Sequence, residues 1–261
     1  YWNYQNDLLD EITQKIYAGE SETAEERTRL IKDATTEGVN ESVRIFLASK
    51  VDQYVSNENL DGVINALGAG VPSRFTPINA ETADQNITIG VKQIYQGAWN
   101  PVAGLTDTYS TQIWFTLFDP SLTGHPFSGK IFPIRTDWKI ETHGSQSVVN
   151  VPTDAVIWDS KSKNWKEVGP NTLATSKATF DLNLGEWHNG QKMNMNDIIY
   201  STYFLLEWGS EKDENDKTFD SDYSPQAAQT AKTLVGIKPI DDDTIEVYTN
   251  YWHFDEGEIA S

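Results

Sequence analysis

The feature that most constrains the fold is a change of hydrophobic period between residues 178 and 209. Apolar and polar side chains alternate over 178–184, which is typical of a strand with one buried face. After the turn sequence at 187–190, apolar residues recur at helical spacing up to Trp208, behind an N-cap at Asn194 or Asn196. A strand, a turn and an amphipathic helix in succession predict an α/β chain, mixed α+β, in which helices pack on a sheet.

The first segment, residues 1–78, predicts two helices followed by a strand. The first helix ends at Gly19, and the second begins with a capping box at Thr23 and ends at Gly38. The mostly apolar run 43–48 predicts a buried strand. We therefore expect a helix, helix, strand unit ahead of a polar connector.

The second segment, residues 79–261, predicts a larger mixed unit. Alternation over 87–91 predicts its first strand, and Thr106 is expected to cap a helix from Asp107 to about Phe118. Further elements are expected as short strands within 121–144, a helix from Pro225 to Leu234, and a hairpin of 235–240 with 244–249.

Charge and composition exclude several functions. The chain has 20 Lys and Arg against 39 Asp and Glu, a net charge of −19, so it repels phosphate backbones and we expect no nucleic-acid partner. Without cysteine it has no thiolate site, its four His lack a metal-ligand spacing, and Asp213 to Asp222 lacks the glycine of a calcium loop, with Thr218 in its place. With no nucleophile elbow and no nucleotide motif, we expect neither metal, cofactor nor enzymatic activity.

The block from Thr179 to Ser201 resembles a known family signature. Its Trp187-His188-Asn189-Gly190 turn lies between a strand and a helix, as in the oligopeptide- and dipeptide-binding class, family 5, of ABC importer solute-binding proteins. Asn189 stands where that class has Asp. The 240–248 hairpin resembles the strand pair that follows in the family, and 87–101 resembles its opening strand and loop. The resemblance implies a lobe like that of type II periplasmic binding proteins, incomplete within this sequence.

The order of the resembling parts is unusual. The segment 1–78 resembles the late first-lobe region of such a binder, whereas 79–261 resembles its N-terminal part. We therefore expect the chain to be an internal portion of a longer polypeptide. No signal peptide is recognisable at its start, so the chain is expected to begin after one.

The resemblance implies an exported protein, extracellular and associated with the cell surface. It would capture oligopeptides in a cleft between two lobes and deliver them to an ABC permease, with the remaining lobe of the same polypeptide as a further partner. β-Linked oligosaccharides such as cello-oligosaccharides are the alternative ligand. A surface structural or assembly protein and a secreted carbohydrate-active enzyme are alternatives from other classes. Two sequons, at Asn40 and Asn86, would be glycosylation acceptors outside an archaeal or eukaryotic cell.

Aromatic residues supply the candidate binding site. The chain has nine Trp and eleven Tyr, side chains that stack on sugars and line amphipathic peptide sites. Trp99 and Asn100 precede a proline in a loop after an expected strand, where α/β sheets bind ligands. We expect them, together with Tyr95 and Tyr109, to bind the ligand.

Overall fold

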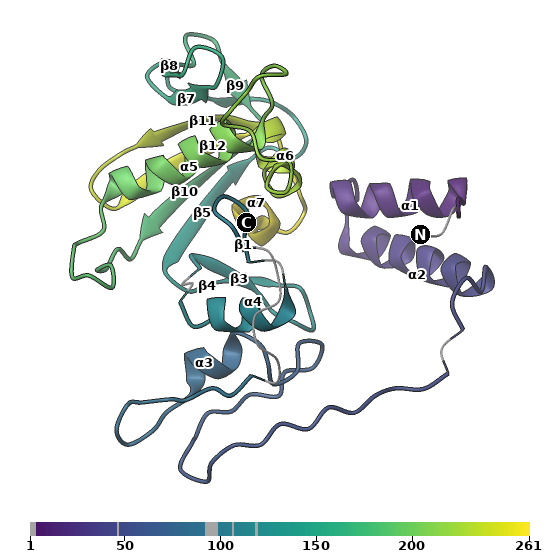
Figure 1. The fold of residues 1–261 in the computed structure, drawn as a ribbon. Helices are drawn as coiled ribbons and strands as arrows, with labels where there is room; N and C mark the ends of the chain where they lie inside the picture. Colours follow the sequence, from purple (N-terminus) through teal and green to yellow (C-terminus); the bar gives the residue numbers. More distant parts are fainter. Residues whose placement is uncertain (1–3, 46, 92–98, 106, 118–119) are drawn as a thin grey trace.

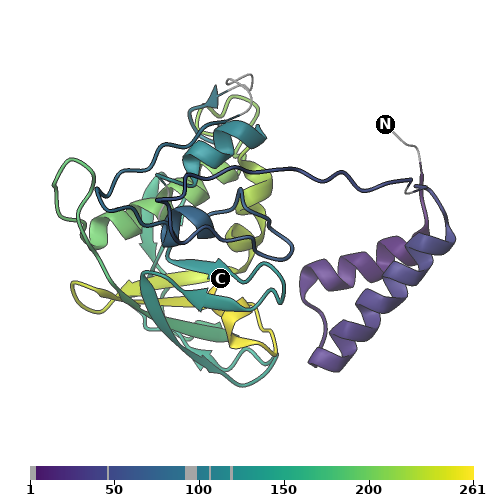
Figure 2. The ribbon, with the colours of Figure 1, turned by 90° about the horizontal axis from the view of Figure 1, so that it is seen from below.

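The computed structural model describes residues 4–45, 47–91, 99–105, 107–117 and 120–261 and shows a mixed helix and sheet architecture (Figure 1). A helical hairpin stands beside a body built on an antiparallel sheet, and a long extended segment connects the two (Figure 2). Within the described residues, no helix combines the length and apolar character needed to cross a bilayer.

The hairpin consists of α1 (Asp7–Ala18) and α2 (Ala24–Asn40), which confirms the two helices expected from the sequence. Gly19 caps α1 in the left-handed region at φ 69°, a conformation that glycine adopts without strain. Thr23 caps α2 by accepting the Glu26 N–H at 3.1 Å. The predicted stop at Gly38 is wrong, because α2 continues to Asn40. Glycine permits a left-handed turn but does not impose one.

The strand predicted at 43–48 does not form. The segment 41–57, which we call the arm, begins with a turn at 41–44, and its other described residues run extended, outside any helix or strand (Figure 2). Ile45 is 80% exposed and Leu47 is 92% exposed. An apolar run predicts burial but supplies no neighbouring strand, and no sheet edge reaches the described arm residues.

The strand predicted at 87–91 is also absent. These residues are extended but pair with no strand in the described chain, and Ile87 and Ile89 are exposed. Alternation of apolar residues here again lacks a partner strand. Neither segment therefore joins a sheet in the described chain.

The main sheet has six strands in the spatial order β5-β10-β12-β11-β7-β8, and all pairings between its described strands are antiparallel. The predicted strand over 178–184 and the predicted hairpin are confirmed as β10 and as β11 with β12. The hairpin of β7 and β8 was not predicted. The bounds of the six strands are β5 Thr136–Thr142, β7 Val156–Asp159, β8 Asn164–Glu167, β10 Ser176–Leu182, β11 Leu234–Pro239 and β12 Thr244–Thr249.

Three further pairs of short strands lie outside this sheet. The short strands expected within 121–144 are confirmed as β3, β4 and β5. The pairs are β1 Trp99–Asn100 with β2 Gly104–Leu105, β3 Leu122–Gly124 with β4 Ile131–Pro133, and β6 Val149–Asn150 with β9 Leu173–Ala174.

Helices α5 (Met195–Gly209) and α6 (Ser224–Thr233) cover one face of the sheet, as the sequence predicted (Figure 1). Leu206 of α5 packs there with Ile237 and Ile245 from the central strands. Burying each of these side chains contributes about 2 kcal/mol. The residues of the opposite face include Lys177, which pairs with Glu141 at 2.7 Å and with Glu246 at 3.4 Å. The sheet is therefore amphipathic, with its main core under α5 and α6.

Three shorter helices complete the body: α3 (Phe75–Asn79), α4 (Thr108–Trp114) and α7 (Glu256–Ala260). The helix expected from Asp107 to Phe118 is shorter, because the chain tightens into turns after Trp114. Its cap is Asp107, which accepts the Tyr109 and Ser110 N–H groups. Aspartate caps a helix as well as threonine does. The expected cap Thr106 and the expected end Phe118 lie outside the described residues.

Candidate functional site

An open crevice of about 1980 Å³ lies between the arm, the segment 71–91 and α4. Its walls include residues 53–56 of the arm and the extended segment 87–91. Side chains of α4, among them Tyr109, line it as well. Pockets for compact small molecules occupy roughly 300–1,000 Å³. The crevice is larger than such a pocket and has room for a ligand of several residues.

A framework of backbone contacts holds this part of the chain in place. Asp61 and Glu81 exchange two backbone hydrogen bonds of 3.0 Å. Gly62, at φ 77°, lies so close to the neighbouring backbone that a Cβ would approach the Asn79 carbonyl oxygen to 1.8 Å. Glycine is therefore required at this position. The Thr76 hydroxyl also accepts the Ile64 N–H at 3.2 Å, which links the two sides of this loop.

The main chain of both walls is unbonded. In the part of the chain that the structure describes, no backbone N–H or C=O of residues 53–56 or 87–91 takes part in a hydrogen bond with another protein group. An extended segment with open donors and acceptors is a template for an added strand. The crevice therefore offers two such templates.

A buried hydroxyl also borders the crevice. Ser73 is 8% exposed, and its Oγ has no hydrogen-bond partner among the described residues. A buried polar atom without a partner costs about 1–3 kcal/mol. The next residue is Arg74, whose guanidinium lies 5.3 Å from the ring centre of Phe115. A ligand that hydrogen-bonds to Ser73 would satisfy this group.

The crevice is acidic. Among the described residues that line it, one ammonium group, Lys50, faces five carboxylates, and it pairs with Asp52 at 2.9 Å. The backbone N–H of Asn86 and the Thr82 hydroxyl hold the pKa of Asp84 below its usual range. Asp84 therefore stays ionised at neutral pH. The other three lining carboxylates belong to Glu58, Asp61 and Glu81.

The structure separates the residues expected to bind the ligand. Tyr109 lines the crevice, but Trp99 and Asn100 do not. Trp99 lies in β1 and is 63% exposed. Tyr95 lies outside the described residues. Of the three described residues, one therefore lines the crevice and two do not.

Asn100 instead positions two loops. Its Oδ1 accepts the Val102 and Ala103 N–H groups at 2.8 and 3.1 Å. Its Nδ2 donates to Asp220 at 3.0 Å and to Asp222 at 3.4 Å. An asparagine amide has two donors and two acceptor sites, so no capacity is left for a ligand in this arrangement. The contact also lowers the pKa of Asp220.

The turn that carries the family resemblance is a closed unit between β10 and α5. The Gly190 N–H donates to the Trp187 carbonyl at 2.8 Å, and the Trp187 N–H donates to Gln191 at 2.8 Å. Asn194 and Asp197 then form the capping box of α5, in which the Asn194 N–H donates to Asp197 at 2.8 Å. Trp187 remains about half exposed at the rim of this turn.

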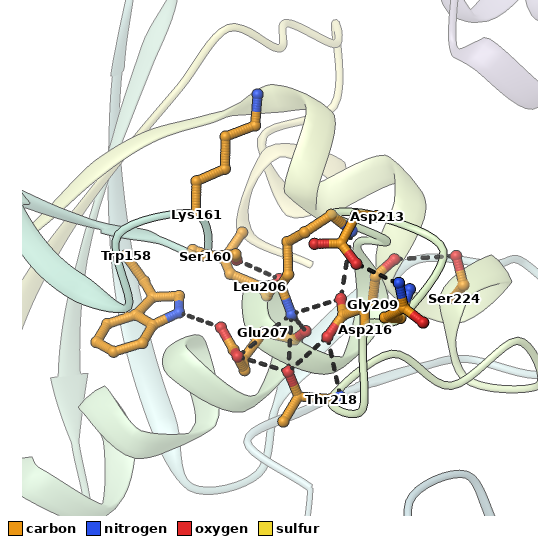
Figure 3. Close-up of polar contacts among 12 residues, drawn as sticks. Trp158, Ser160, Lys161, Leu206, Glu207, Gly209, Asp213, Asp216, Thr218 and Ser224 are labelled. Carbon is orange, nitrogen blue, oxygen red and sulfur yellow. Dashed lines mark hydrogen bonds and ion pairs between the residues drawn. The ribbon is translucent and has the colours of Figure 1, made fainter.

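A buried polar cluster under α5 was missed from the sequence (Figure 3). Glu207, 1% exposed, accepts hydrogen bonds from Trp158 and Thr218, each at 2.7 Å. Lys212 lies 3.2 Å from this carboxylate and 2.9 Å from Asp216. We call these five residues the Glu207 cluster. An acidic residue inside the apolar run of α5 was the signal that could have revealed it.

Electrostatics fix the charge state of this cluster. Burial raises the pKa of Glu207, but hydrogen bonds from Thr218, Trp158 and Lys212 outweigh burial and lower it below its usual range. The pKa of Asp216 is also lowered, because contacts with Lys212 and Thr218 outweigh the effect of burial. Both carboxylates are ionised and fully partnered. The cluster therefore anchors the 210–220 loop to β7 and offers no reactive group.

No set of three or more His, Cys, Asp or Glu side chains within the described ranges is arranged to hold a metal ion. The Asp213 carboxylate, in the segment compared with a calcium loop, accepts the Asn215 N–H of its own loop at 2.8 Å. The acidic segment is thus organised by local hydrogen bonds.

Family models and curated proteins provide no match for this chain. No model of a known protein family matches it, and none of the curated proteins searched matches its sequence. Its function therefore has to be argued from the geometry of the crevice and from the residues of the β10 to α5 turn.

Proposed function

We propose that the chain is part of an extracytoplasmic solute-binding component of an ABC importer and that it captures oligopeptides. The observation that carries the proposal is the crevice, whose two extended walls expose unbonded main chain beside Tyr109. Peptides are recognised on such edges through their own backbone, which gives affinity largely independent of sequence. The strand, turn and capped helix around Trp187 supply further support, since this block resembles the family signature.

Capture would use an incomplete lobe of the type II periplasmic-binding-protein kind. The remaining lobe of the same polypeptide would close over the bound peptide, and a membrane permease would receive it. Closure follows from binding only if the peptide contacts the closed state better than the open one. The protein would act outside the cell, associated with its surface, without cofactor or catalytic step.

The test is calorimetric titration of the chain with capped, unstructured peptides of three to six residues. We expect saturable binding that weakens about two- to tenfold in Tyr109→Ala, because an aromatic contact of this kind is worth roughly 0.5–1.5 kcal/mol. Tyr17→Ala, which removes an exposed tyrosine of α1, is the matched control and should bind unchanged.

Absence of saturable binding to every peptide would contradict the proposal. Binding of cello-oligosaccharides in its place, lost in Trp99→Ala, would support uptake of β-linked sugars through the exposed Trp99 ring. The two outcomes involve different residues, so they can be distinguished with the same titration.

A further inference from the structure

We propose that the crevice selects cationic peptides and binds them in an extended conformation as an added strand. This inference rests on the proposed function and narrows it to one class of ligand. It is carried by two independent features of the crevice: the form of its walls and the sign of its charge.

The walls fix the conformation of the ligand. Residues 53–56 and 87–91 are both extended, and an extended peptide between them can bond to either edge through alternate N–H and C=O groups. Val51 and Val55 of the arm line the crevice, and Val55 is 98% exposed. Residues four apart in a strand point to the same side, so these two valines provide apolar contacts about four peptide residues apart.

The charge fixes the class of side chain. Lys50 is the one cation among the described lining residues, and its ammonium is already paired with Asp52, so a bound peptide faces Glu58, Asp61, Glu81 and Asp84. The Arg74 guanidinium lies next to this lining, against the ring of Phe115. All four of these residues are exposed to solvent. Lysine or arginine side chains of a peptide reach such carboxylates, whereas acidic side chains are repelled.

The Ser73 hydroxyl gives an additional fixed point. It is the buried group next to the crevice whose Oγ has no partner among the described residues, and it can donate to a peptide carbonyl or accept a peptide N–H. Its position favours a ligand that carries backbone amides over one that carries only apolar groups.

The experiment compares three capped pentapeptides that differ only at their second and fourth residues, which are lysine, glutamine or glutamate on an alanine background. We expect the lysine peptide to bind about tenfold tighter than the glutamine peptide at low ionic strength. The ratio should shrink at roughly 0.15 M salt, where the Debye length is about 8 Å. Replacing alternate amide hydrogens of the lysine peptide by methyl groups should abolish its binding.

The double variant Glu58→Gln with Glu81→Gln removes two of the four carboxylates. Its preference for the lysine peptide should therefore fall from tenfold to about threefold, with the affinity for the glutamine peptide unchanged. The matched control, Glu22→Gln with Glu25→Gln on the helical hairpin, should keep the tenfold preference. Equal binding of the three peptides by the unaltered chain would overturn charge selection and leave peptide capture intact. Full binding of the methylated peptide would overturn the added strand. Binding of none of the peptides would overturn the proposed function itself.

Discussion

Glu207 is a buried carboxylate that stays ionised although its neighbours in α5 are apolar. It lies between Leu206 and Trp208 in the most apolar part of α5, where an isolated carboxylate would take up a proton. Three donors from other parts of the chain keep it ionised. The stability of this region therefore depends on individual partners more than on the amount of apolar surface.

Replacing Lys212 tests this dependence. Lys212→Met leaves Glu207 and Asp216 without their shared ammonium, and breaking a buried pair costs about 3–5 kcal/mol. We expect urea unfolding to show that loss. Lys217→Met, at an exposed lysine of the same loop, should change stability by less than about 0.5 kcal/mol. Equal effects of the two substitutions would show that the cluster contributes no special stability.

Acid stability gives a second test at the same residue. The pKa of Glu207 is lower in the folded chain than in the unfolded chain, where it is about 4.3, so its ionisation stabilises the fold above that pH. This contribution is lost as the pH falls toward the folded pKa. Glu207→Gln should therefore be less stable at neutral pH and should lose less stability between about pH 5 and pH 3. Denaturation midpoints across this range provide the measurement, with the exposed Glu214→Gln as control. A steeper acid slope in Glu207→Gln than in the control would contradict the assignment.

At the scale of elements, two glycines of the helical hairpin have opposite roles. Gly19 is left-handed, and a Cβ there would lie 2.7 Å from the Tyr251 hydroxyl, so it shapes both the cap of α1 and the contact between hairpin and body. Gly38 lies inside α2 with open space around it. The same residue type is therefore required at one end of the hairpin and dispensable at the other.

Alanine at each glycine should reveal this difference. Gly19→Ala should destabilise the chain by about 1 kcal/mol or more, because it forces a side chain into the left-handed region and against Tyr251. Gly38→Ala should stabilise α2 by about 0.5–1 kcal/mol, since glycine in a helix interior is unfavourable relative to alanine. Thermal unfolding followed by circular dichroism measures both. Stabilisation by Gly19→Ala would contradict the observed cap.

Elements whose signals are local could be predicted from the sequence. The caps at Gly19, Thr23 and Asn194, and the hairpin turn at 241–243, each depend on residues a few positions apart. Local signals could not decide whether 43–48 forms a strand, because a strand also needs a neighbouring strand to pair with. The same holds for the candidate site. The sequence offers Tyr109 as an aromatic residue of the helix expected from Asp107, whereas the unbonded walls and Ser73 result from contacts between distant segments.

At the scale of the whole molecule, the protein consists of a hairpin, an arm and a body, which differ in how many apolar residues they bury. The body has two buried apolar clusters around its sheet. Neither α1 nor α2 contains a buried residue. The arm, which follows α2 and leads to the body, exposes Ile45, Leu47 and Val51. The arm, which connects the hairpin to the body, is therefore the part of the backbone with the fewest stabilising contacts.

The arm is therefore the expected first site of cleavage by trypsin. Arg44 and Lys50 are exposed and lie outside any helix or strand, so the chain around them can fit a protease active site without local unfolding. We expect a first cut after one of them well before cleavage at the buried Lys212. Gel electrophoresis with mass spectrometry of the fragments provides the measurement, and Arg44→Gln with Lys50→Gln should delay the cut. Early cleavage inside the sheet would contradict this order.

A single nick in the arm would also change the state of the fragment it frees. A pair of helices of 12 and 17 residues without a buried core is marginal in water on its own. Once severed, the hairpin would retain its contact with Tyr251 but lose the tether that keeps its local concentration high. The released peptide should then diffuse away and lose its helical signal, while the larger fragment stays folded.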